Sequence, residues 1–447
     1  MNIVVIVSDT CRPDRLGCYG NTWMRTPALD ALAAASVAFD SCYLSSFPTL
    51  PHRADCFLGR LSCLEFGWGP MPREQATLAE LLSGAGYVTQ LIHDTPHLTA
   101  RGHYYERGFQ GYQWIRGQEG DCPLTRTNDV PPMDWPVELD RYDAPEYYNH
   151  TRQRRDYPGE AGHHSQRTVA EACRWLEANP RADRFFLWVD LFDPHEPWDA
   201  PDCLTALYYE GDFPDRRVRH PRYAATDFLT EDELRWCHAA YCGELTLVDK
   251  AIGALLRQIE DLGLLDDTAI IFTSDHGFYL GEHGRIGKSG SAEDPWPLYQ
   301  EIAREPLLIR LPDGPRGERR NQLVQPVDLR PTILELCGVG DTPRPHGRSL
   351  VPLLGGANVR LRELAFSAGC LRDRSRMGVG VTLTHEDGWS LVMTRDDSRH
   401  ELYYLPDDPC QEHNLIADNQ MMAVEMQAMF RMALSFCGAP AELVKQW

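Results

Sequence analysis

The segment Ile3-Val4-Val5-Ile6-Val7-Ser8-Asp9-Thr10 begins with five apolar residues and ends with three polar ones. A short, continuous apolar run is typical of a strand buried on both faces of a parallel sheet. In open α/β sheets, ligands bind beyond the carboxyl ends of the strands. Asp9 is therefore a candidate ligand of a hard cation. The alternative is a carboxylate that caps the turn after the strand.

The rest of the chain repeats this alternation of short apolar runs and longer amphipathic stretches. The runs at 87–92, 185–189 and 269–273 predict further strands, and the stretches at 26–37, 78–85 and 231–262 predict helices. This order is typical of an α/β fold with a mostly parallel sheet flanked by helices. After Gly355, short strands at 364–367, 378–384 and 390–394 and a helix at 421–436 predict a small α+β subdomain. We expect a catalytic domain over 1–358 and this C-terminal subdomain over 359–447.

Two segments lack a clear period, at 117–164 and 197–228. Long irregular stretches in a compact domain are usually functional loops. We interpret both as insertions over a substrate pocket, and the alternative is solvated surface loops.

Charge and cysteine content narrow the function classes. The chain has 447 residues, and 44 Lys and Arg against 65 Asp and Glu give a net charge of −21. That balance opposes nucleic-acid binding, which needs a basic face, but it allows a small anionic substrate. No apolar stretch is long enough to span a membrane. Fourteen cysteines without a Cys-x-x-Cys pair, and no recognisable export signal, predict reduced thiols in a cytoplasmic protein. A homo-oligomer is compatible with the sequence.

A second polar cluster, Thr273-Ser274-Asp275-His276-Gly277, also follows a predicted strand. A carboxylate beside an imidazole suits Zn, Mn or Fe. A buried carboxylate without a partner is costly, and this favours a cation nearby. The alternative is a capped turn with a hydrogen-bonded histidine.

The stretch Phe47-Pro48-Thr49-Leu50-Pro51-His52-Arg53 precedes residues of helical character at 54–60. A hydroxyl at a helix start lies near free backbone N–H groups that bind anions. Arg53, one turn further on, can make paired hydrogen bonds to phosphate or sulfate oxygens. The alternative is a proline-rich turn in which Thr49 is an N-cap.

Additional basic groups occur in Asp193-Pro194-His195-Glu196-Pro197, in Gly281-Glu282-His283 and at Lys288. They can protonate a leaving group or bind an anion. Taken singly, each is more typical of a structural or surface residue, and only their order and spacing together favour function.

This ordered set resembles the sulfatase branch of the alkaline phosphatase superfamily over essentially the whole chain. The resemblance also includes Cys11-Arg12-Pro13-Asp14-Arg15, Thr26-Pro27-Ala28-Leu29-Asp30, Pro326-Val327-Asp328-Leu329-Arg330 and Glu401-Leu402-Tyr403-Tyr404-Leu405. It implies an alkaline-phosphatase-like α/β sandwich with a C-terminal antiparallel subdomain. It also implies one divalent metal (Mn, Zn or Ca) held by Asp9, Asp275 and His276, with Thr10 at the family's further ligand position. Arg53, His195 and Lys288 match the family's arginine, histidine and lysine positions.

The chain departs from this family at the nucleophile. Sulfatases carry Cys or Ser at the first position of Cys/Ser-x-Pro-x-Arg and oxidise it to formylglycine, whereas Thr49 stands there. Because the β-carbon of threonine bears a methyl group, oxidation would give a ketone and not an aldehyde. The lysine that follows Gly-Tyr-x-Thr in sulfatases is also missing, and Thr95 and His97 are the candidate substrate contacts there. Phosphonate monoester hydrolases are similar in layout but use formylglycine.

The set Asp9, Thr49, Asp275 and His276 is similar to one metal site of nucleotide pyrophosphatase/phosphodiesterases, which use a Thr nucleophile. We therefore expect a metal-dependent hydrolase of phosphodiesters or phosphonate monoesters, with Thr49 as nucleophile and metal ligand and no second metal. Arg53 and Lys288 would stabilise the transition state, and His195 or His283 would protonate the leaving group. The alternatives are a sulfatase that works without formylglycine and an inactive binding protein.

Overall fold

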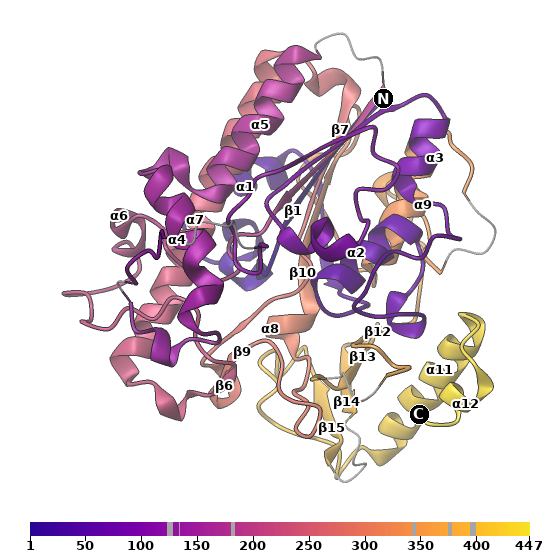
Figure 1. Cartoon of the computed structure of the whole chain (residues 1–447). Helices are drawn as coiled ribbons and strands as arrows, with labels where there is room; N and C mark the ends of the chain where they lie inside the picture. The colour runs from indigo at the N-terminus through magenta and orange to yellow at the C-terminus, as the bar shows by residue number, and fades with distance from the viewer. Residues whose placement is uncertain (123–127, 134, 180–183, 342–345, 374–377, 394–398) are drawn as a thin grey trace.

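Strand β1 (Asn2–Ser8) lies in the middle of the main sheet (Figure 1). All of its residues are buried. Val4 and Ile6 face a core that includes residues of α1 (Pro27–Ala34), α5 (His164–Ala178) and α7 (Glu231–Asp261). Ile3, Val5 and Val7 face a second core with α2 (Thr49–Leu58), α3 (Leu78–Gly84) and α9 (Leu329–Leu336). The apolar run therefore forms the buried strand that its composition predicts. The computed structural model describes residues 1–447 except 123–127, 134, 180–183, 342–345, 374–377 and 394–398.

The main sheet has the strand order β11-β2-β10-β7-β1-β5-β3-β4. Strand β10 pairs antiparallel with both of its neighbours, and every other pairing in the sheet is parallel. The α/β class with a mostly parallel sheet is confirmed. The strands are β2 (Val37–Tyr43), β3 (Val88–His93), β4 (Gly111–Trp114), β5 (Phe185–Leu191), β7 (Thr268–Thr273), β10 (Arg304–Arg310) and β11 (Glu318–Arg320).

One predicted helix is shorter than expected. The helix expected at 26–37 ends at Ala34, and Val37 instead begins β2. The apolar residues of 37–39 continued the helical pattern in the sequence, but in the structure they pair with β10 and β11. Pairing with distant strands decides where this helix ends, and local hydrophobic periodicity does not predict it.

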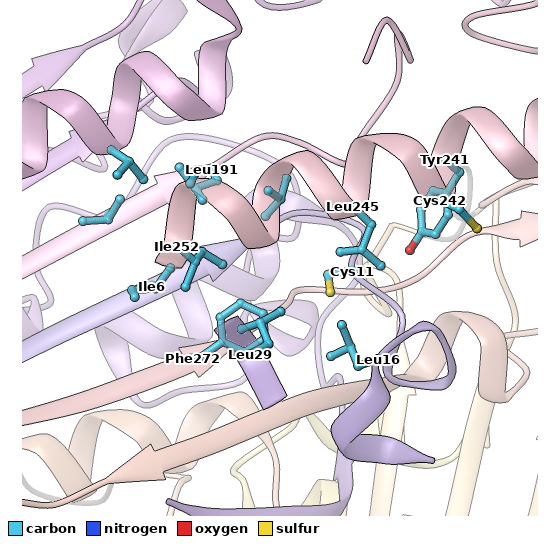
Figure 2. Packing of buried hydrophobic residues seen from close by; sticks show 14 of the residues in the cluster. Ile6, Cys11, Leu16, Leu29, Leu191, Tyr241, Cys242, Leu245, Ile252 and Phe272 are labelled. Atoms are coloured by element: carbon cyan, nitrogen blue, oxygen red, sulfur yellow. The ribbon is translucent and has the colours of Figure 1, made fainter. Parts of the chain in front are cut away.

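Helix α7 packs across the sheet and also reaches the strand ends (Figure 2). Its N-terminus carries a capping box between Thr230 and Glu233. Leu245 and Ile252 are fully buried in the core that contains Ile6 and Phe272. Near the other end of that apolar face, the hydroxyl of Tyr241 donates a hydrogen bond to the carbonyl oxygen of Thr10 (2.8 Å). The core helix therefore holds the loop that follows β1.

The C-terminal part forms a separate antiparallel sheet of β12 (Leu364–Ala368), β13 (Val381–His385), β14 (Trp389–Met393) and β15 (Glu401–Tyr404). Helix α11 (Gln420–Phe436) packs against this sheet with its buried residues Met426 and Phe430. The predicted short strands and terminal helix are confirmed within one to three residues at each end, although Thr394 lies outside the described residues. Other short helices are α8 (Gln300–Ala303), α10 (Val351–Leu354) and α12 (Ala441–Val444).

The two expected insertions contain some regular structure. The prediction of an irregular segment at 117–164 is wrong for α4 (Tyr148–Asp156). This helix is polar, and its sequence has too few apolar residues to show a helical period. The segment 197–228 contains α6 (Asp202–Thr205) and β6 (Ala224–Ala225). Strand β6 pairs with β9 (Arg285–Gly287), which in turn pairs with β8 (Tyr279–Leu280). The second insertion therefore lies directly against the residues that lead to Lys288.

None of the helices among the described residues combines the length and apolar character that a membrane crossing requires.

Candidate active site

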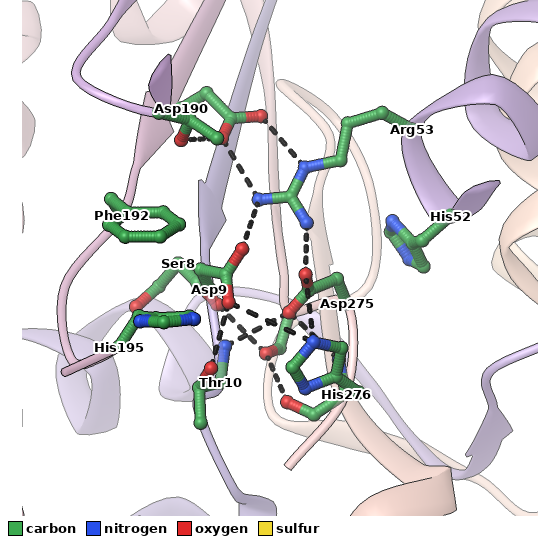
Figure 3. A network of polar contacts seen from close by, with 12 residues as sticks. Ser8, Asp9, Thr10, His52, Arg53, Asp190, Phe192, His195, Asp275 and His276 are labelled. Atoms are coloured by element: carbon green, nitrogen blue, oxygen red, sulfur yellow. Dashed lines mark hydrogen bonds and ion pairs between the residues drawn. The ribbon is translucent and has the colours of Figure 1, made fainter. Parts of the chain in front are cut away.

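The candidate site lies where four neighbouring parallel strands end, and most of its residues come from these ends. Asp9 follows β1, Asp275 and His276 follow β7, and Asp190 is the penultimate residue of β5. Thr95 follows β3, which pairs with β5. Because the carboxyl ends of parallel strands share one edge, these side chains converge there, as Figure 3 shows for the residues of β1, β5 and β7.

Asp9, Asp275 and His276 form a compact donor set. One ligand atom from each lies within 4.8 Å of the others, and all three side chains are fully buried. The Nδ1 of His276 lies 3.0 Å from the carbonyl oxygen of Gly277, so Nε2 faces Asp275 Oδ2 at 3.5 Å and Asp9 Oδ1 at 3.9 Å. Burial lowers the pKa of His276 to about 3, and the imidazole is therefore neutral. A neutral imidazole beside two carboxylates is a donor set that suits Zn²⁺ or Mn²⁺.

Thr10 holds the two carboxylates in place. Its backbone N–H donates to Asp275 Oδ1 (2.9 Å), and its hydroxyl donates to Asp9 Oδ1 (2.7 Å). Its φ of 62° lies in the left-handed region, which is strained for a β-branched residue. The contacts to Asp9, Asp275 and Tyr241 keep Thr10 in this conformation.

Arg53 joins three acidic side chains in the middle of the site (Figure 3). Its Nε lies 3.1 Å from Asp190 Oδ2, and its Nη2 lies 2.9 Å from Asp190 Oδ1, which makes a bidentate pair. Nη1 donates to Asp275, and Nη2 also lies 3.3 Å from Asp9 Oδ2. Burial alone would lower the pKa of Arg53, but Asp190, Asp275 and Asp9 raise it well above its ordinary value. The guanidinium is permanently charged.

The negative charge of the site exceeds what Arg53 neutralises. Burial, and next the charge of Asp275, raises the pKa of Asp9 well above its ordinary value. For Asp275 the sign is reversed, because the charge of Arg53 outweighs burial and lowers its pKa. Asp9 Oδ2 accepts no hydrogen bond from the described residues. This fully buried oxygen, ion-paired with Arg53 at 3.3 Å but without a hydrogen bond, and the neutral imidazole beside it fit a divalent cation.

Thr49 is the first residue of α2 and is almost fully buried, with 2% of its surface exposed. Pro48 occupies the N-cap position, so the alternative of Thr49 as an N-cap is wrong. Since residues four apart share one face of a helix, Thr49 lies one turn before Arg53 on the same face. The hydroxyl of Thr49 makes no hydrogen bond to the described residues. The ring of Phe47, two residues earlier, lies 5.1 Å from that of His276.

Lys288 and His195 flank the donor set. The Nζ of Lys288 lies 3.4 Å from His276 Nε2. The Nδ1 of His195 lies 2.7 Å from the carbonyl oxygen of Glu196, and its ring stacks on Phe192 at 4.1 Å. Burial, and next the charge of Lys288, lowers the pKa of His195 well below its ordinary value.

The other predicted contacts divide into two groups. The hydroxyl of Thr95 donates to Asp190 Oδ1 (2.7 Å), and the ring of His97 lies 5.8 Å from Phe192. Thr95 and His97 therefore belong to the surroundings of Arg53 and His195. His283 instead lies with Nε2 3.6 Å from Glu301 and its ring 4.1 Å from Tyr299. No described contact joins His283 to the donor set.

Asp190 is the residue that the sequence interpretation missed. It lies inside the apolar segment 185–191, where a single carboxylate was the available signal. A charge inside a buried strand needs a partner. Asp190 has three partner residues: Arg53 and Thr95, described above, and Trp188, whose indole N–H donates to Oδ2 (2.9 Å).

Two cavities open beside the site. One of about 250 Å³ is lined by Pro48, which precedes Thr49, and by Ser289, which follows Lys288. The other, of about 530 Å³, shares Ser289 and is lined further by Arg141, Arg222, Tyr223, Asp294 and Trp296. Ser289, the residue after Lys288, therefore lines both cavities.

Family models match this chain over nearly its whole length. The model described as "Sulfatase" matches residues 1–339, and "N-sulphoglucosamine sulphohydrolase, C-terminal" matches residues 293–435. The "Arylsulfatase" of Clostridium perfringens is 26% identical, with 93% of this chain and 90% of that protein covered. Human "Arylsulfatase A" is 28% identical, with 82% of this chain and 70% of that protein covered.

Among solved structures, the phosphonate monoester hydrolase of Agrobacterium radiobacter matches with a TM-score of 0.75 at 22% identity, covering 97% of this chain and 95% of that one. At this identity the likeness shows the shared fold. The first family model alone covers about three quarters of the chain and includes the ends of β1, β5 and β7. The chain therefore belongs to the sulfatase family of the alkaline phosphatase superfamily and is a hydrolase of ester bonds.

Proposed function

We propose that this protein is a metal-dependent hydrolase of phosphate esters, phosphodiesters or phosphonate monoesters, with Thr49 as its nucleophile. The observation that carries the proposal is the position of Thr49. It starts α2 one turn before Arg53, and the Arg53 guanidinium lies among Asp9, Asp190 and Asp275. This is the nucleophile position of the family, and a threonine there cannot become formylglycine.

Asp9, Asp275 and His276, with the Thr49 hydroxyl, are the groups that would hold one divalent cation. Such a cation lowers the pKa of a bound hydroxyl and polarises a substrate oxygen. The hydroxyl of Thr49 gives its proton to solvent, its Oγ1 attacks phosphorus, and the bond between phosphorus and the leaving oxygen breaks. The charge on the equatorial oxygens is stabilised by Arg53 and Lys288.

The leaving alkoxide takes its proton from His195. In the free protein, burial and Lys288 keep this imidazole neutral. A bound anionic substrate raises the pKa of a neighbouring imidazole and so favours the protonated form that an acid requires. Water then attacks phosphorus, the Thr49 ester bond breaks, and neutral His195 accepts the proton of that water. The Thr49 alkoxide takes a proton from solvent and is regenerated as the hydroxyl.

The second candidate is hydrolysis of sulfate esters by the same groups. It is favoured by the relatives, because the proteins reported above by sequence similarity are arylsulfatases. In this case the Thr49 alkoxide or a hydroxide would attack sulfur directly. An inactive binding protein is the third alternative, and it predicts no turnover of any ester.

The test begins with metal analysis of the purified protein and a mass measurement of the peptide that contains Thr49. Turnover is then compared on 4-nitrophenyl sulfate, 4-nitrophenyl phosphate, 4-nitrophenyl phenylphosphonate and bis(4-nitrophenyl) phosphate, with Mn or Zn added. We expect an unmodified Thr49, a preference for the diester or phosphonate, and a loss of at least about 10³-fold in kcat for Thr49→Ala with metal content unchanged.

Thr49→Ser is the matched control, because it keeps the hydroxyl and should retain turnover. A preference for the sulfate would favour the second candidate. Full activity of Thr49→Ala would show that Thr49 is not the nucleophile.

A further inference from the structure

Arg141 and Arg222 line the 530 Å³ cavity beside Lys288, and each comes from one of the two insertions. We propose that this cavity binds a second anionic group of the substrate, an oxyanion carried by the alcohol part of the ester. The oxyanion can be a carboxylate or a further sulfate or phosphate. The inference rests on the proposed function in one respect, namely that the ester bond is broken at Thr49.

The backbone holds the two arginines on neighbouring segments. The N–H of Arg141 donates to the carbonyl oxygen of His220 (2.9 Å), and the N–H of Arg222 donates to that of Leu139 (3.1 Å). Between these bonds, Asp140 and Pro221 form an isolated β-bridge. The two insertions are therefore joined at the cavity wall, and the spacing of the arginines is set before a ligand arrives.

Both guanidinium groups lie over aromatic rings, and neither is paired with a carboxylate. The Arg141 guanidinium lies 3.6 Å from the ring centre of Tyr223, and that of Arg222 lies 4.4 Å from Phe228. Neither arginine has an ion pair within 4.0 Å among the residues that the structure describes. Stacking restrains a guanidinium while its in-plane N–H groups stay free for an oxyanion.

The acidic groups near the cavity leave this positive charge only partly balanced. Glu196 and Glu119 act on Arg141 from beyond ion-pair distance. Asp294, on the cavity wall, lies 3.9 Å from Arg399. In a chain with 65 acidic residues and a net charge of −21, two arginines without a carboxylate partner on one cavity wall are a specific feature. They raise the local concentration of anions.

Packing connects the cavity to the reacting groups. The ring of Tyr223, over which Arg141 lies, packs on Gly287, where an added Cβ would come within 2.6 Å of the ring. Gly287 also has a φ of 120°, so this position tolerates no larger residue. The next residue is Lys288, whose Nζ is 3.4 Å from His276 Nε2. Lys288 thus stands in the chain between Gly287, on which Tyr223 packs, and Ser289 of the cavity wall, and the alcohol part of the ester would extend from the donor set toward that wall.

The experiment uses paired aryl esters of whichever class the enzyme turns over. The 3-carboxy-4-nitrophenyl ester is compared with its neutral 3-carbamoyl counterpart, and a 3-sulfo ester separates carboxylate from sulfonate recognition. The measured quantity is the ratio of kcat/KM for the charged and the neutral ester. We expect Arg141→Gln and Arg222→Gln each to lower this ratio about tenfold relative to the natural enzyme.

Arg217→Gln is the matched control. Arg217 belongs to the insertion that carries Arg222, and its guanidinium also lies over an aromatic ring, that of Phe213, at 4.8 Å. Unlike Arg222, it pairs with a carboxylate, that of Asp202, and does not line the cavity. Its ratio should equal that of the natural enzyme. An unchanged ratio in the Arg141→Gln/Arg222→Gln double variant would overturn the inference.

A second measurement distinguishes failure of the proposed function from failure of this inference. If no ester is turned over, calorimetric titration of the product 5-hydroxy-2-nitrobenzoate, against its amide, tests the cavity directly. We expect the carboxylate to bind about tenfold more weakly to the double variant. Equal binding of the carboxylate by the natural protein and by the double variant would overturn the inference, whatever the outcome for Thr49.

Discussion

Arg53 and Asp190 form a bidentate ion pair, with Nε to Oδ2 at 3.1 Å and Nη2 to Oδ1 at 2.9 Å, and both side chains are fully buried. The pair joins helix α2, which carries Thr49, to strand β5 of the central sheet. A planar guanidinium bound through two of its nitrogens has a defined orientation. Asp190 therefore positions Arg53 and, through α2, the start of the helix.

Asp190→Asn tests this positioning. One partner of a buried pair is then neutral, and we expect a loss of about 3 kcal/mol in the free energy of unfolding, measured by urea denaturation. We also expect a lower kcat, because Arg53 loses its second fixed hydrogen bond. Asp232→Asn, which breaks the exposed pair with Arg235, is the control and should leave the unfolding midpoint in place. Equal midpoints for the two variants would contradict the positioning role.

The roles of the two histidines are separated by leaving-group dependence. We expect His195→Gln to lower kcat/KM by about 10²-fold or more for an alkyl ester, and less for a 4-nitrophenyl ester, since nitrophenolate leaves without a proton. His283→Gln is the matched comparison, because His283 contacts Glu301 and Tyr299. It should affect both esters equally and weakly. A selective effect of His283→Gln on the alkyl ester would reverse the assignment.

Lys288→Met removes the positive charge next to His276. Because this charge would stabilise the equatorial oxygens of the transition state, we expect kcat/KM to fall by about 10²–10³-fold. The loss should appear in kcat as well as in KM, as steady-state kinetics would show. Lys250→Met is a control, since Lys250 pairs with Glu160 on the surface. A change in KM alone would assign Lys288 to ground-state binding only.

Metal removal tests the donor set independently of turnover. A bound cation stabilises the folded state by mass action, by about 2.7 kcal/mol when its concentration is one hundred times the Kd. We therefore expect a chelator to lower the Tm of the natural protein. Asp9→Asn should lower metal content and remove the effect of the chelator on Tm. A chelator effect that persists in this variant would place the cation elsewhere.

The buried carboxyl of Asp55, also on α2, predicts a pH-dependent stability. Burial raises its pKa from 3.8 to about 7, although hydrogen bonds from Ser45 and Ser62 lower it. Because the folded state binds this proton more tightly than the unfolded state, the stability contribution is present below about pH 4 and is lost as the pH rises through about 7.

Unfolding measured at several pH values checks this sign. Between about pH 4 and about pH 7, Asp55→Asn should remove a slope of up to about 1.4 kcal/mol per pH unit. Asp266→Asn, at an exposed position, should keep the slope of the natural protein. Identical slopes for Asp55→Asn and the natural protein would contradict the assigned pKa.

Much of the fold and half of the site could be predicted from the order of residues. An apolar run that ends in Asp9, and another that ends in Asp275 and His276, are local signals, because strand composition and the residues after a strand are contiguous in the chain. The α/β class, the C-terminal antiparallel sheet and the Thr49 substitution needed no long-range information. These features depend on the chemistry of neighbours in sequence.

Other features depend on pairings between distant segments, and only the tertiary structure decided them. Val37 became a strand residue because β10 and β11 lie on both sides of β2. Asp190 became a partner of Arg53 because α2 packs against β5, with Phe57 on Trp188, although 137 residues separate the two side chains along the chain. Arg141 and Arg222 line one cavity because their backbone N–H groups donate hydrogen bonds to the carbonyl oxygens of His220 and Leu139, which join the two insertions. Local composition carries no record of which strand or loop will be the neighbour, since packing and hydrogen bonding of the whole chain select it.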